Sequence, residues 1–317
     1  MKSRIPGILG IEYPILQGGM IWVTDAGLAA AVSEAGGLGV IGAGGMSPQE
    51  VEEEIDRAKE LTARPFGVNV PLLRPDAGDV VEAVGRSGAA VLTTSAGNPL
   101  TYIPKAKEMG LKVVHVVSNV RMAQKAQEAG VDVIVAEGYE AGGHNGFDEI
   151  TTMALVPQVA DAVDVPVAAA GGIGDARGMV AAFALGAEGV QLGTRFLASL
   201  ESPAHPHYKE LILSASDRDT VITGRAFGLV RVIKNKLAED ILRAEREGWS
   251  PEKIQEMIGH GRSMKASFEG DTNEGSFMSG QIAGMLTELK SVKDIIADLV
   301  EGYEAIAAGL LEGETGE

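Results

Sequence analysis

Short apolar runs alternate with longer amphipathic stretches through the first two-thirds of the chain. Eight of these runs have the length of buried strands, and most of them are rich in β-branched residues. Eight strands that alternate with helices favour a closed (β/α)8 TIM barrel over an open, doubly wound sheet. The predicted strands are Ile15–Gln17, Leu38–Ile41, Phe66–Val70, Ala90–Thr93, Lys112–Val117, Val131–Ala136, Pro166–Ala170 and Gly189–Leu192.

The stretches between these runs carry helix start and stop signals. In "TDAGLAAAVSEAGG", Thr24 or Asp25 is a candidate N-cap and Gly36 a candidate C-cap. In "SPQEVEEEIDRAKELT", Ser47 is a candidate N-cap, and Pro48 lies in the first turn, where an N–H group has no helical partner to lose. Both stretches are therefore predicted helices.

The pattern changes after about Pro206, where strand-like runs largely stop. The segment "RVIKNKLAEDILRAEREGWSPEKIQEMIGHG" reads as a helix, a Ser-Pro cap and a second helix. We therefore expect a TIM barrel made of residues 1–222 and 281–317, with a C-terminal, mostly helical cap at 223–280 over one barrel mouth. The stretch "SVKDIIADLVEGYEAIAAGL" is predicted to pack back on the barrel as a helix, and "EGETGE" to be a solvated tail.

Composition narrows the possible functions. The formal net charge of −17 opposes binding to nucleic-acid phosphates. The chain has no apolar run of about 18 residues that would span a bilayer, and Pro6 and Glu12 interrupt the N-terminal stretch before a signal-like core forms. We expect a cytoplasmic protein with no nucleic-acid or membrane partner. Because cysteine is absent, disulfides, thiolate metal sites and a thiol nucleophile are excluded.

Glycines cluster directly after the predicted strands. In a TIM barrel these loops form the active face, and the loops after strands seven and eight often hold a phosphate group. Glycine lets such a loop bend sharply and lets its N–H groups approach an anion. The glycine-rich loops are "QGGM" at 17–20, "GAGGM" at 42–46, "AEGYEAGGHNG" at 136–146, "AGGI" at 170–173 and "LGTRF" at 192–196.

Two of these loops form a candidate phosphate site. Gly171 and Gly172 precede the predicted helix "DARGMVAAFALG", and Gly193 and Thr194 follow one βα unit later. This arrangement can place two clusters of amide groups and one hydroxyl around a single phosphate. Alternatively, the glycines only form tight turns; the order of the two loops favours the phosphate site.

Two polar side chains are candidates for the barrel mouth. Asn69, at the end of the third predicted strand, offers an amide that can bond a heterocyclic edge; alternatively, it caps the following proline turn. His144 lies among Gly142, Gly143 and Gly146, which allow the loop to bring the imidazole over the mouth. His144 is a candidate acid, base or hydrogen-bond donor, against the alternative of a surface histidine without a role.

The other histidines give weaker signals. His115 lies within a strand and is expected to be a satisfied interior or strand-end residue. His205 and His207 lie near a predicted helix start, and His260 lies near a helix end. None is spaced with a carboxylate as a metal site, so no metal is expected. The stretches "GDARG" and "GGLGV" lack the G-x-G-x-x-G spacing of a dinucleotide-binding Rossmann fold.

Together the motifs resemble those of an FMN-dependent family. They are "QGGM.W", "AGGLGVIG", "RPFGVNV", "TTSAGNP", "AEGYEAGGH", "AAGGI", "GVQLGTRF" and "GSFMSGQIAG". This set is similar to the group that contains nitronate monooxygenase and the flavin-type enoyl-acyl carrier protein reductase. The resemblance runs from Tyr13 to about Val300, and it implies a TIM barrel with a helical cap and one non-covalent FMN.

The resemblance also implies roles for individual residues. Its cofactor residues place Gly19 and Met20 beside the isoalloxazine, Asn69 on the ring edge, Glu137 at the ribityl chain, and Gly171, Gly172, Gly193 and Thr194 at the phosphate. The implied catalytic residue is His144, on the substrate side of the flavin. The predicted substrate contacts are Gly143, Asn145, Met278 and Gln281.

The resemblance leaves the activity open between two enzymes. "AEG", Ala170 and "GSFMSGQIAG" favour an enoyl-acyl carrier protein reductase that uses NADH or NADPH, while Asn145 and the "FDE" insertion are closer to nitronate oxidation. A related NAD(P)H:quinone reductase has a lysine where this chain has Val116. Two alternatives outside the family are a non-flavin isomerase of phosphorylated sugars and a binding protein without catalysis.

The expected partners are a small molecule or an acyl thioester. For the reductase they include acyl carrier protein, for which "RVIKNK" at 231–236 is a candidate basic patch. The stretch "FMSGQIAGML" at 277–286 is predicted either to line a substrate tunnel or to form a homodimer contact.

Overall fold

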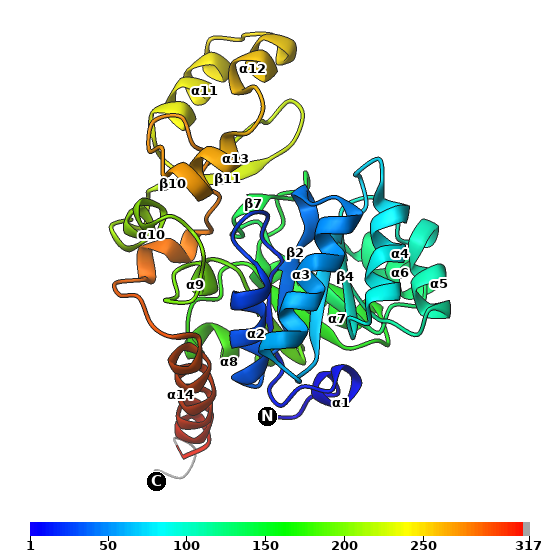
Figure 1. The fold of residues 1–317 in the computed structure, drawn as a ribbon. Helices are drawn as coiled ribbons and strands as arrows, with labels where there is room; N and C mark the ends of the chain where they lie inside the picture. The colour runs from blue at the N-terminus through cyan, green and yellow to red at the C-terminus, as the bar shows by residue number, and fades with distance from the viewer. Residues whose placement is uncertain (313–317) are drawn as a thin grey trace.

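A computed structural model describes residues 1–312 and shows a barrel with a separate cap above it (Figure 1). Within these residues, eight parallel strands form one sheet in the order β1-β9-β8-β6-β5-β4-β3-β2. Every predicted strand is present, with bounds that shift by at most a few residues. The strands are β1 Ile15–Gln17, β2 Gly39–Gly42, β3 Phe66–Pro71, β4 Val91–Ser95, β5 Lys112–Val117, β6 Val133–Glu137, β8 Val167–Ala170 and β9 Gly189–Leu192.

The barrel closes between β1 and β2 through few contacts. Leu16 bridges Leu38 in parallel, and the Gln17 N–H donates to the Leu38 carbonyl at 2.9 Å. The buried side chain of Gln17 extends this pairing, because its Nε2 donates to the Val40 carbonyl at 2.9 Å and its Oε1 accepts from the Val40 N–H at 3.1 Å. A side-chain amide thus replaces the next rung of the backbone ladder and confirms the closed barrel.

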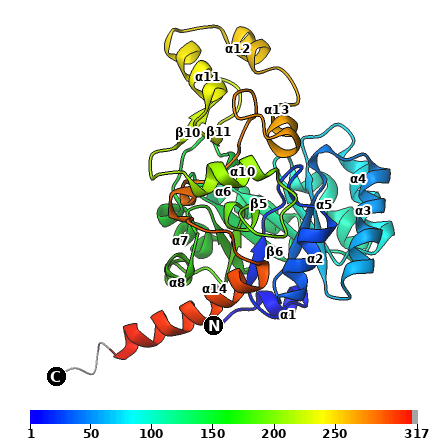
Figure 2. The same ribbon diagram turned by 60° about the vertical axis from the view of Figure 1, so that its left-hand side comes forward.

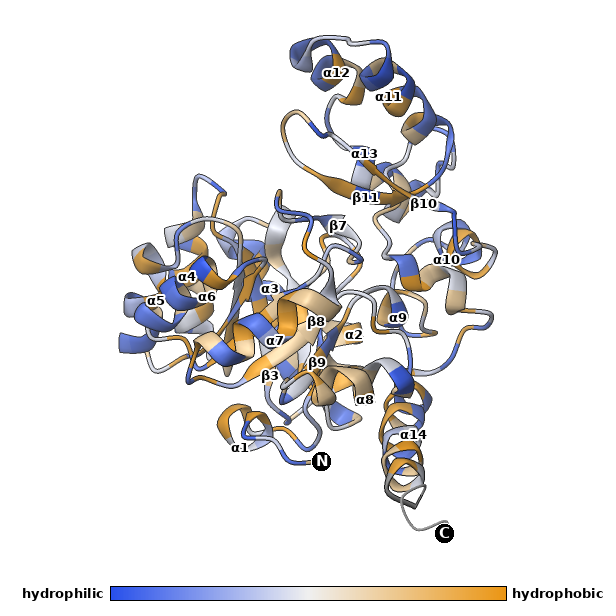
Figure 3. Cartoon of the chain, turned by 180° about the vertical axis from the view of Figure 1, so that it is seen from behind, coloured by the Kyte–Doolittle hydropathy of each residue, from blue (hydrophilic) through white to orange (hydrophobic). Residues whose placement is uncertain are grey.

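Helices surround the sheet, and their starts follow the predicted signals. Asp25 caps α2 by accepting from the Leu28 N–H at 2.9 Å, and Ser47 forms a capping box with Glu50 at the start of α3. In Figure 3 the strands are coloured mostly as apolar, as expected for a sheet covered by helices. The helices are α2 Ala26–Glu34, α3 Pro48–Leu61, α4 Ala77–Ser87, α5 Pro99–Glu108, α6 Val120–Glu128, α7 Thr152–Ala162 and α8 Ala176–Ala184.

The short helix α1, Ile5–Leu9, closes the bottom of the barrel. Its Ile5 and Leu9 are buried in one cluster with barrel-interior residues such as Leu16, Val40 and Val135. The interior at this end is therefore filled with apolar side chains, and a ligand can enter only at the opposite mouth.

The cap begins with a β-hairpin that the sequence analysis did not predict. β10 Thr220–Thr223 pairs antiparallel with β11 Val230–Ile233, and β11 pairs with the short strand β7, Gly143–His144. The predicted helix from Arg231 was therefore wrong over its first residues, because the β-branched run "LVRVI" pairs with "TVIT" across a glycine-containing turn. The helix starts only at Lys236, after the N-cap Asn235.

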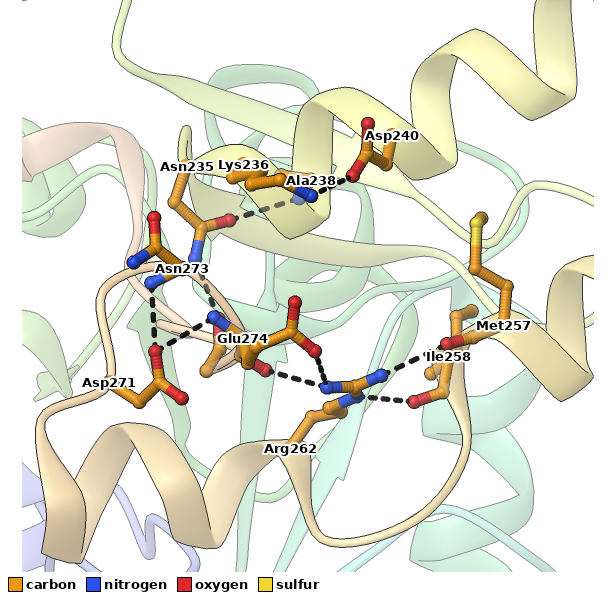
Figure 4. Close-up of polar contacts among 11 residues, drawn as sticks. Asn235, Lys236, Ala238, Asp240, Met257, Ile258, Arg262, Asp271, Asn273 and Glu274 are labelled. Atoms are coloured by element: carbon orange, nitrogen blue, oxygen red, sulfur yellow. Dashed lines mark hydrogen bonds and ion pairs between the residues drawn. The ribbon is translucent and has the colours of Figure 1, made fainter.

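The rest of the cap is helical, as expected. It contains α11 Lys236–Arg246, α12 Pro251–Ile258, α13 Arg262–Met264 and a π-helical turn at Lys265–Glu269. Figure 4 shows how polar contacts hold these pieces together. Arg262 donates to the carbonyls of Ile258 at 2.6 Å and Met257 at 3.1 Å, and it pairs with Glu274. Asn235 caps α11 and donates to the Gly275 carbonyl at 2.7 Å, so the returning chain is fixed to the cap.

The short helix η1, Ala43–Gly45, lies in the loop after β2. Barrel and cap are joined through α9 Thr194–Leu197, α10 Pro206–Leu213 and η3 Gln281–Met285, and the long helix α14 Val292–Glu312 follows. The first half of α14 packs on the barrel through Ile295, Ile296 and Leu299, as predicted, and its second half projects outward (Figure 2). Residues 313–317 of the predicted tail lie outside the described residues. None of the described helices is long and apolar enough to cross a membrane.

His115 is buried between the strands and the surrounding helices. Its Nδ1 lies 2.7 Å from Thr94 Oγ1, its Nε2 has no partner among residues 1–312, and the side chain is 0% exposed. Burial lowers the pKa of His115 from 6.5 to about 4, because the charged ring would lose its hydration. The expectation of a satisfied interior or strand-end residue is thus confirmed for the burial and wrong for Nε2.

We therefore expect His115 to make the fold sensitive to acid. Between pH 6.5 and about 4, an unfolded chain binds a proton at this site that the folded chain does not bind. The free energy of unfolding should fall across this range by up to about 3 kcal/mol from this residue. In His115→Phe, urea titrations should show a smaller loss of stability between pH 7 and 4.5 than in the wild type. Parallel pH dependences in both proteins would contradict this assignment.

Candidate active site

The loops after β1 and β3 touch at the barrel mouth. A Cβ atom on Gly19 would lie 2.2 Å from Asn69 Cβ, so only glycine fits there. Asn69 is 8% exposed, and its Oδ1 accepts from Thr93 Oγ1 at 3.3 Å. Its amide therefore points across the strand ends, and it makes no hydrogen bond to the proline turn in the described part of the chain. This geometry favours the barrel-mouth role of Asn69 over the capping alternative.

Met20 is held in the same loop by Thr24. The Met20 N–H donates to Thr24 Oγ1 at 3.0 Å, and Thr24 Oγ1 donates to the Met20 carbonyl at 2.8 Å. Met20 Sδ lies 3.5 Å from the position that a Cβ on Gly193 would take. The loop after β1 thus contacts both Asn69 and the loop after β9, as the predicted flavin residues require.

The two predicted phosphate loops differ in why they contain glycine. Gly171 and Gly172 have φ angles of +84° and +71°, so the turn itself requires glycine at both positions. Gly193 has an ordinary φ of −104°, and a Cβ there would meet only Met20 Sδ, at an ordinary contact distance of 3.5 Å. The fold does not need a glycine at 193. Its absent side chain instead leaves open backbone that a ligand can approach.

Thr194 is buried beside this open backbone. Its Oγ1 accepts a hydrogen bond from the Gly280 N–H at 2.9 Å. The hydroxyl proton remains available, so Thr194 can still donate to an anion while it holds the segment that returns from the cap. The structure thus brings Gly193, Thr194 and Gly280 together, although the sequence separates them widely.

The loop after β6 packs directly against this returning segment. A Cβ on Gly142 would lie 2.6 Å from the Gly280 nitrogen, and the Gln281 N–H donates to the Glu140 carbonyl at 2.9 Å. Gly143 has a φ of +79°, and Met278 Sδ lies 3.6 Å from its Cβ position. The predicted substrate residues Gly143 and Met278 are therefore neighbours.

His144 lies at the end of this loop, in strand β7. Its backbone pairs with Val230 of the cap hairpin, and its side chain is exposed. The surrounding protein still removes part of the hydration of the ring and lowers the pKa of His144 below its ordinary value. A neutral ring near pH 7 offers one N–H donor and one acceptor nitrogen to a ligand.

Asn145 and Gln281 lie at the site, but their polar groups also shape the loop. Asn145 Nδ2 donates to the carbonyls of Ala141 and Gly143, both at 3.0 Å. Gln281 is fixed through its backbone, and its side chain is exposed. A substrate contact by either side chain stays a prediction.

Glu137 ends strand β6 on the interior side of the barrel mouth. Burial raises the pKa of Glu137 to about 7, and its carboxyl group makes no hydrogen bond within residues 1–312. A carboxyl group without protein partners at the mouth is suited to accept from, or donate to, ligand hydroxyl groups.

Two polar residues of the site were missed from the sequence. Gln191 pairs with Ala170 in the sheet register, and Ala170 pairs with Glu137. The side chain of Gln191 is 8% exposed and makes no hydrogen bond to other described residues. Glu140 accepts from the Thr152 N–H at 3.0 Å and lies 3.3 Å from the Cβ position of Gly172. The signal for Gln191 was a glutamine inside the apolar strand "GVQL". No signal in the sequence pointed to Glu140.

An aromatic contact closes one side of the mouth. The rings of Trp22 and Phe268 meet edge to face, with centroids 5.8 Å apart. Trp22 has an unusual φ of +67°, and its indole covers Gly45, where a Cβ would lie 2.1 Å from the ring. Phe268 is 54% exposed and Met264 is 43% exposed. Barrel and cap thus share an apolar wall, here defined as Trp22, Met264 and Phe268, that remains open to a ligand.

The remaining histidines do not join this site. His205 caps α10, where its Nδ1 accepts from the His207 N–H at 3.2 Å, as the predicted helix start implies. His260 is exposed in the cap. No cluster of three or more histidine, aspartate or glutamate residues that could hold a metal occurs in the region from 1 to 312. The expectation of a metal-free site stays a prediction.

Known proteins match the chain over most of its length. A family model described as nitronate monooxygenase matches residues 2–91 and 81–302. The solved structure of FabK from Thermotoga maritima is 47% identical, with a TM-score of 0.94 over 98% of this chain and 99% of that chain. This match confirms the barrel fold and the family resemblance.

Curated relatives carry two kinds of name. A probable nitronate monooxygenase from Staphylococcus saprophyticus is 35% identical over 89% of this chain and 92% of its own. The (3aS,4S,5R,7aS)-5-hydroxy-7a-methyl-1-oxo-octahydro-1H-indene-4-carboxyl-CoA dehydrogenase from Mycobacterium tuberculosis is 33% identical over 95% of both chains. The chain therefore belongs to the nitronate monooxygenase family and is an oxidoreductase.

Proposed function

We propose that the protein is an FMN-dependent enoyl-acyl carrier protein reductase that takes its hydride from NADH or NADPH. The observation that carries the proposal is the 47% identity over 98% of the chain to FabK, the flavin-type enoyl-acyl carrier protein reductase, against 35% to the probable nitronate monooxygenase. The Mycobacterium tuberculosis relative is named for a CoA thioester, which also favours a thioester substrate.

The residues at the mouth fit FMN. The open backbone at Gly193, the turn at Gly171–Gly172 and the Thr194 hydroxyl would hold its phosphate, because N–H groups and a hydroxyl proton are available there. Asn69 would bond the ring edge. Glu137 and Gln191 have polar groups without protein partners in the described chain and would meet the ribityl hydroxyls. When bound, FMN supplies the two-electron transfer between nicotinamide and substrate.

His144 would supply the proton chemistry. Reduction of an enoyl thioester adds a hydride at the β-carbon and a proton at the α-carbon. The neutral ring of His144 can donate its N–H to the thioester carbonyl, which stabilises the charge that develops there. The ring can also relay a proton to the α-carbon: one nitrogen gives up its proton while the other takes one from solvent, to which the side chain is exposed, so the ring stays neutral.

The apolar wall of Trp22, Met264 and Phe268 would accept the acyl chain. Met264 and Phe268 are exposed and Trp22 is half-buried, so each could bury further apolar surface against a ligand. A hydrocarbon chain that leaves the thioester over the barrel mouth would cover them. The basic patch predicted at 231–236 is reduced to Lys234 and Lys236, which are exposed, because Arg231 is only 4% exposed and cannot contact acyl carrier protein.

Nitronate oxidation is the second candidate, favoured by the family model and by the curated nitronate monooxygenases. Both activities place a substrate beneath His144, and they differ in the electron donor. A nitronate is itself oxidised, so this activity requires oxygen and no nicotinamide.

The electron donor separates the two activities. Purified protein loaded with FMN is mixed anaerobically with NADH, NADPH or a nitronate, and the visible flavin absorbance is followed. We expect reduced nicotinamide to bleach the flavin, and crotonyl or longer enoyl thioesters to restore its colour. The reductase proposal would be overturned if neither NADH nor NADPH reduced the flavin while a nitronate bleached it and the protein consumed oxygen in air.

The role of His144 is tested by substitution. His144→Ala should lower turnover of an enoyl thioester by about 10²–10⁴-fold, the usual contribution of a positioned acid or base. The matched control is His260→Ala, which removes an exposed histidine of the cap and should behave as the wild type. Equal rates in all three proteins would remove His144 from the mechanism.

A substitution at Phe268 tests the apolar wall. Phe268→Ser should raise KM about three- to tenfold for a dodecenoyl thioester, which corresponds to the loss of about 1 kcal/mol of apolar contact, and leave KM for crotonyl thioester unchanged. Leu200→Ala is the control, since Leu200 is a comparably exposed apolar residue at 62%. An equal change for both chain lengths would show that Phe268 does not contact the acyl chain.

A further inference from the structure

We propose that Arg231 of the cap is the positioning residue for His144. This inference rests on the proposed function of His144, and it concerns a residue that the sequence suggested only as part of a basic surface. Arg231 lies in β11, and the residue is 4% exposed. It therefore acts inside the protein, on the loop that carries the histidine.

The side chain of Arg231 holds the start of this loop. Its Nε and Nη2 donate to the Tyr139 carbonyl at 3.2 and 2.9 Å, and its Nη1 donates to Thr220 Oγ1 at 3.3 Å. The guanidinium carbon also lies 5.0 Å from the centroid of the Tyr139 ring. Two donors on one carbonyl and a stacked ring fix both the position and the orientation of Tyr139.

The backbone of the same strand holds the end of the loop. Arg231 pairs with Gly143 in the antiparallel register, and Val230 pairs with His144. The Asn145 N–H donates to the Leu229 carbonyl at 2.9 Å, which continues this pairing. One cap residue thus fixes the loop at two points, at Tyr139 through its side chain and at Gly143 through its backbone.

The charge of Arg231 is balanced in an unusual way. No carboxylate lies within ion-pair distance of it among the described residues; Glu140 and Glu149 are the nearest acids that act on it, at longer range. A buried charge without a direct counter-ion is costly, so its carbonyl and ring contacts must compensate. Lysine cannot reproduce them, because an ammonium has neither the planar fork nor the stacking face.

A consequence is that the cap helps to set the position of His144, in addition to the barrel, where Glu140 accepts from the Thr152 N–H. The loop after β6 contains Gly142 and Gly143, which give it little stiffness of its own. Without Arg231 the loop would keep its backbone pairing and the contacts of Glu140, but it would lose the side-chain hold on Tyr139. The ring would then sample more orientations over the barrel mouth, and fewer of them would reach the substrate carbonyl.

The test compares Arg231→Lys and Arg231→Met with Arg225→Ala in FMN-loaded protein. Arg225 is a matched control, because it pairs with Glu149 and contacts the Tyr139 hydroxyl from the exposed side of the same loop. We expect both Arg231 variants to lower kcat for enoyl thioester reduction by about 10–100-fold. Flavin content and the rate of flavin reduction by nicotinamide should stay at wild-type levels, and Arg225→Ala should match the wild type throughout.

A second readout needs no substrate. The pKa of His144 is measured by an NMR titration of the imidazole, assigned with His144→Ala; the charged and titratable groups near the loop are Tyr139, Glu140, Glu149 and Arg225. Arg231→Lys should move the pKa upward toward 6.5, since a loosened loop leaves the ring better hydrated. This result supports positioning even if the wild type fails to reduce enoyl thioesters. Such a failure would contradict only the proposed function.

Two outcomes would overturn the inference. The first is a wild-type kcat and a wild-type His144 titration in Arg231→Lys. The second is an equal loss of flavin reduction and thioester turnover, which would indicate general damage. If Arg231→Met does not fold, Tyr139→Leu replaces it, because this change removes the ring under the guanidinium and keeps the carbonyl; it should lower kcat in the same direction as Arg231→Lys.

Discussion

The close approach of two backbones holds the site together. The loop after β6 and the segment that returns from the cap meet where a side chain on Gly142 would collide with Ser279 and Gly280. The Gln281 N–H donates to the Glu140 carbonyl, and the Gly280 N–H donates to Thr194 Oγ1, both at 2.9 Å. These contacts join the histidine loop, the cap and the predicted phosphate loops. A larger residue at 142 would separate all three.

This arrangement divides the work between barrel and cap. The barrel supplies a rigid floor of strand ends, where Asn69, Glu137 and Gln191 present polar groups at the mouth. The cap supplies the apolar wall through Met264 and Phe268 and fixes the histidine loop through β11. Catalytic loops on a barrel can vary without disturbing its core. Barrel enzymes with the same residues at the strand ends can therefore act on different substrates. Substrate choice in this chain would then depend on the cap.

Local patterns predicted the barrel well, and contacts between distant segments were not predictable. Each βα unit contains its own apolar run, cap and glycine turn, so all eight strands followed from the sequence. The pairing of β11 with β7 joins residues almost ninety positions apart (Val230 and His144), and "LVRVI" was absorbed into a neighbouring helix pattern. Arg231 therefore looked like part of a charged surface, although its side chain is buried. Gln191 was overlooked because an apolar strand surrounds it.

The most direct test of the central claim is to compare the affinities of the apoprotein for FMN and for riboflavin. The two ligands share the ring and ribityl chain and differ in the terminal phosphate, so the comparison isolates the loops at Gly171–Gly172 and Gly193–Thr194. Fluorescence titration should give a Kd for FMN at least about 100-fold lower than for riboflavin, since several charge-assisted hydrogen bonds are lost with the phosphate. Equal affinities, or no binding of either flavin, would contradict the account.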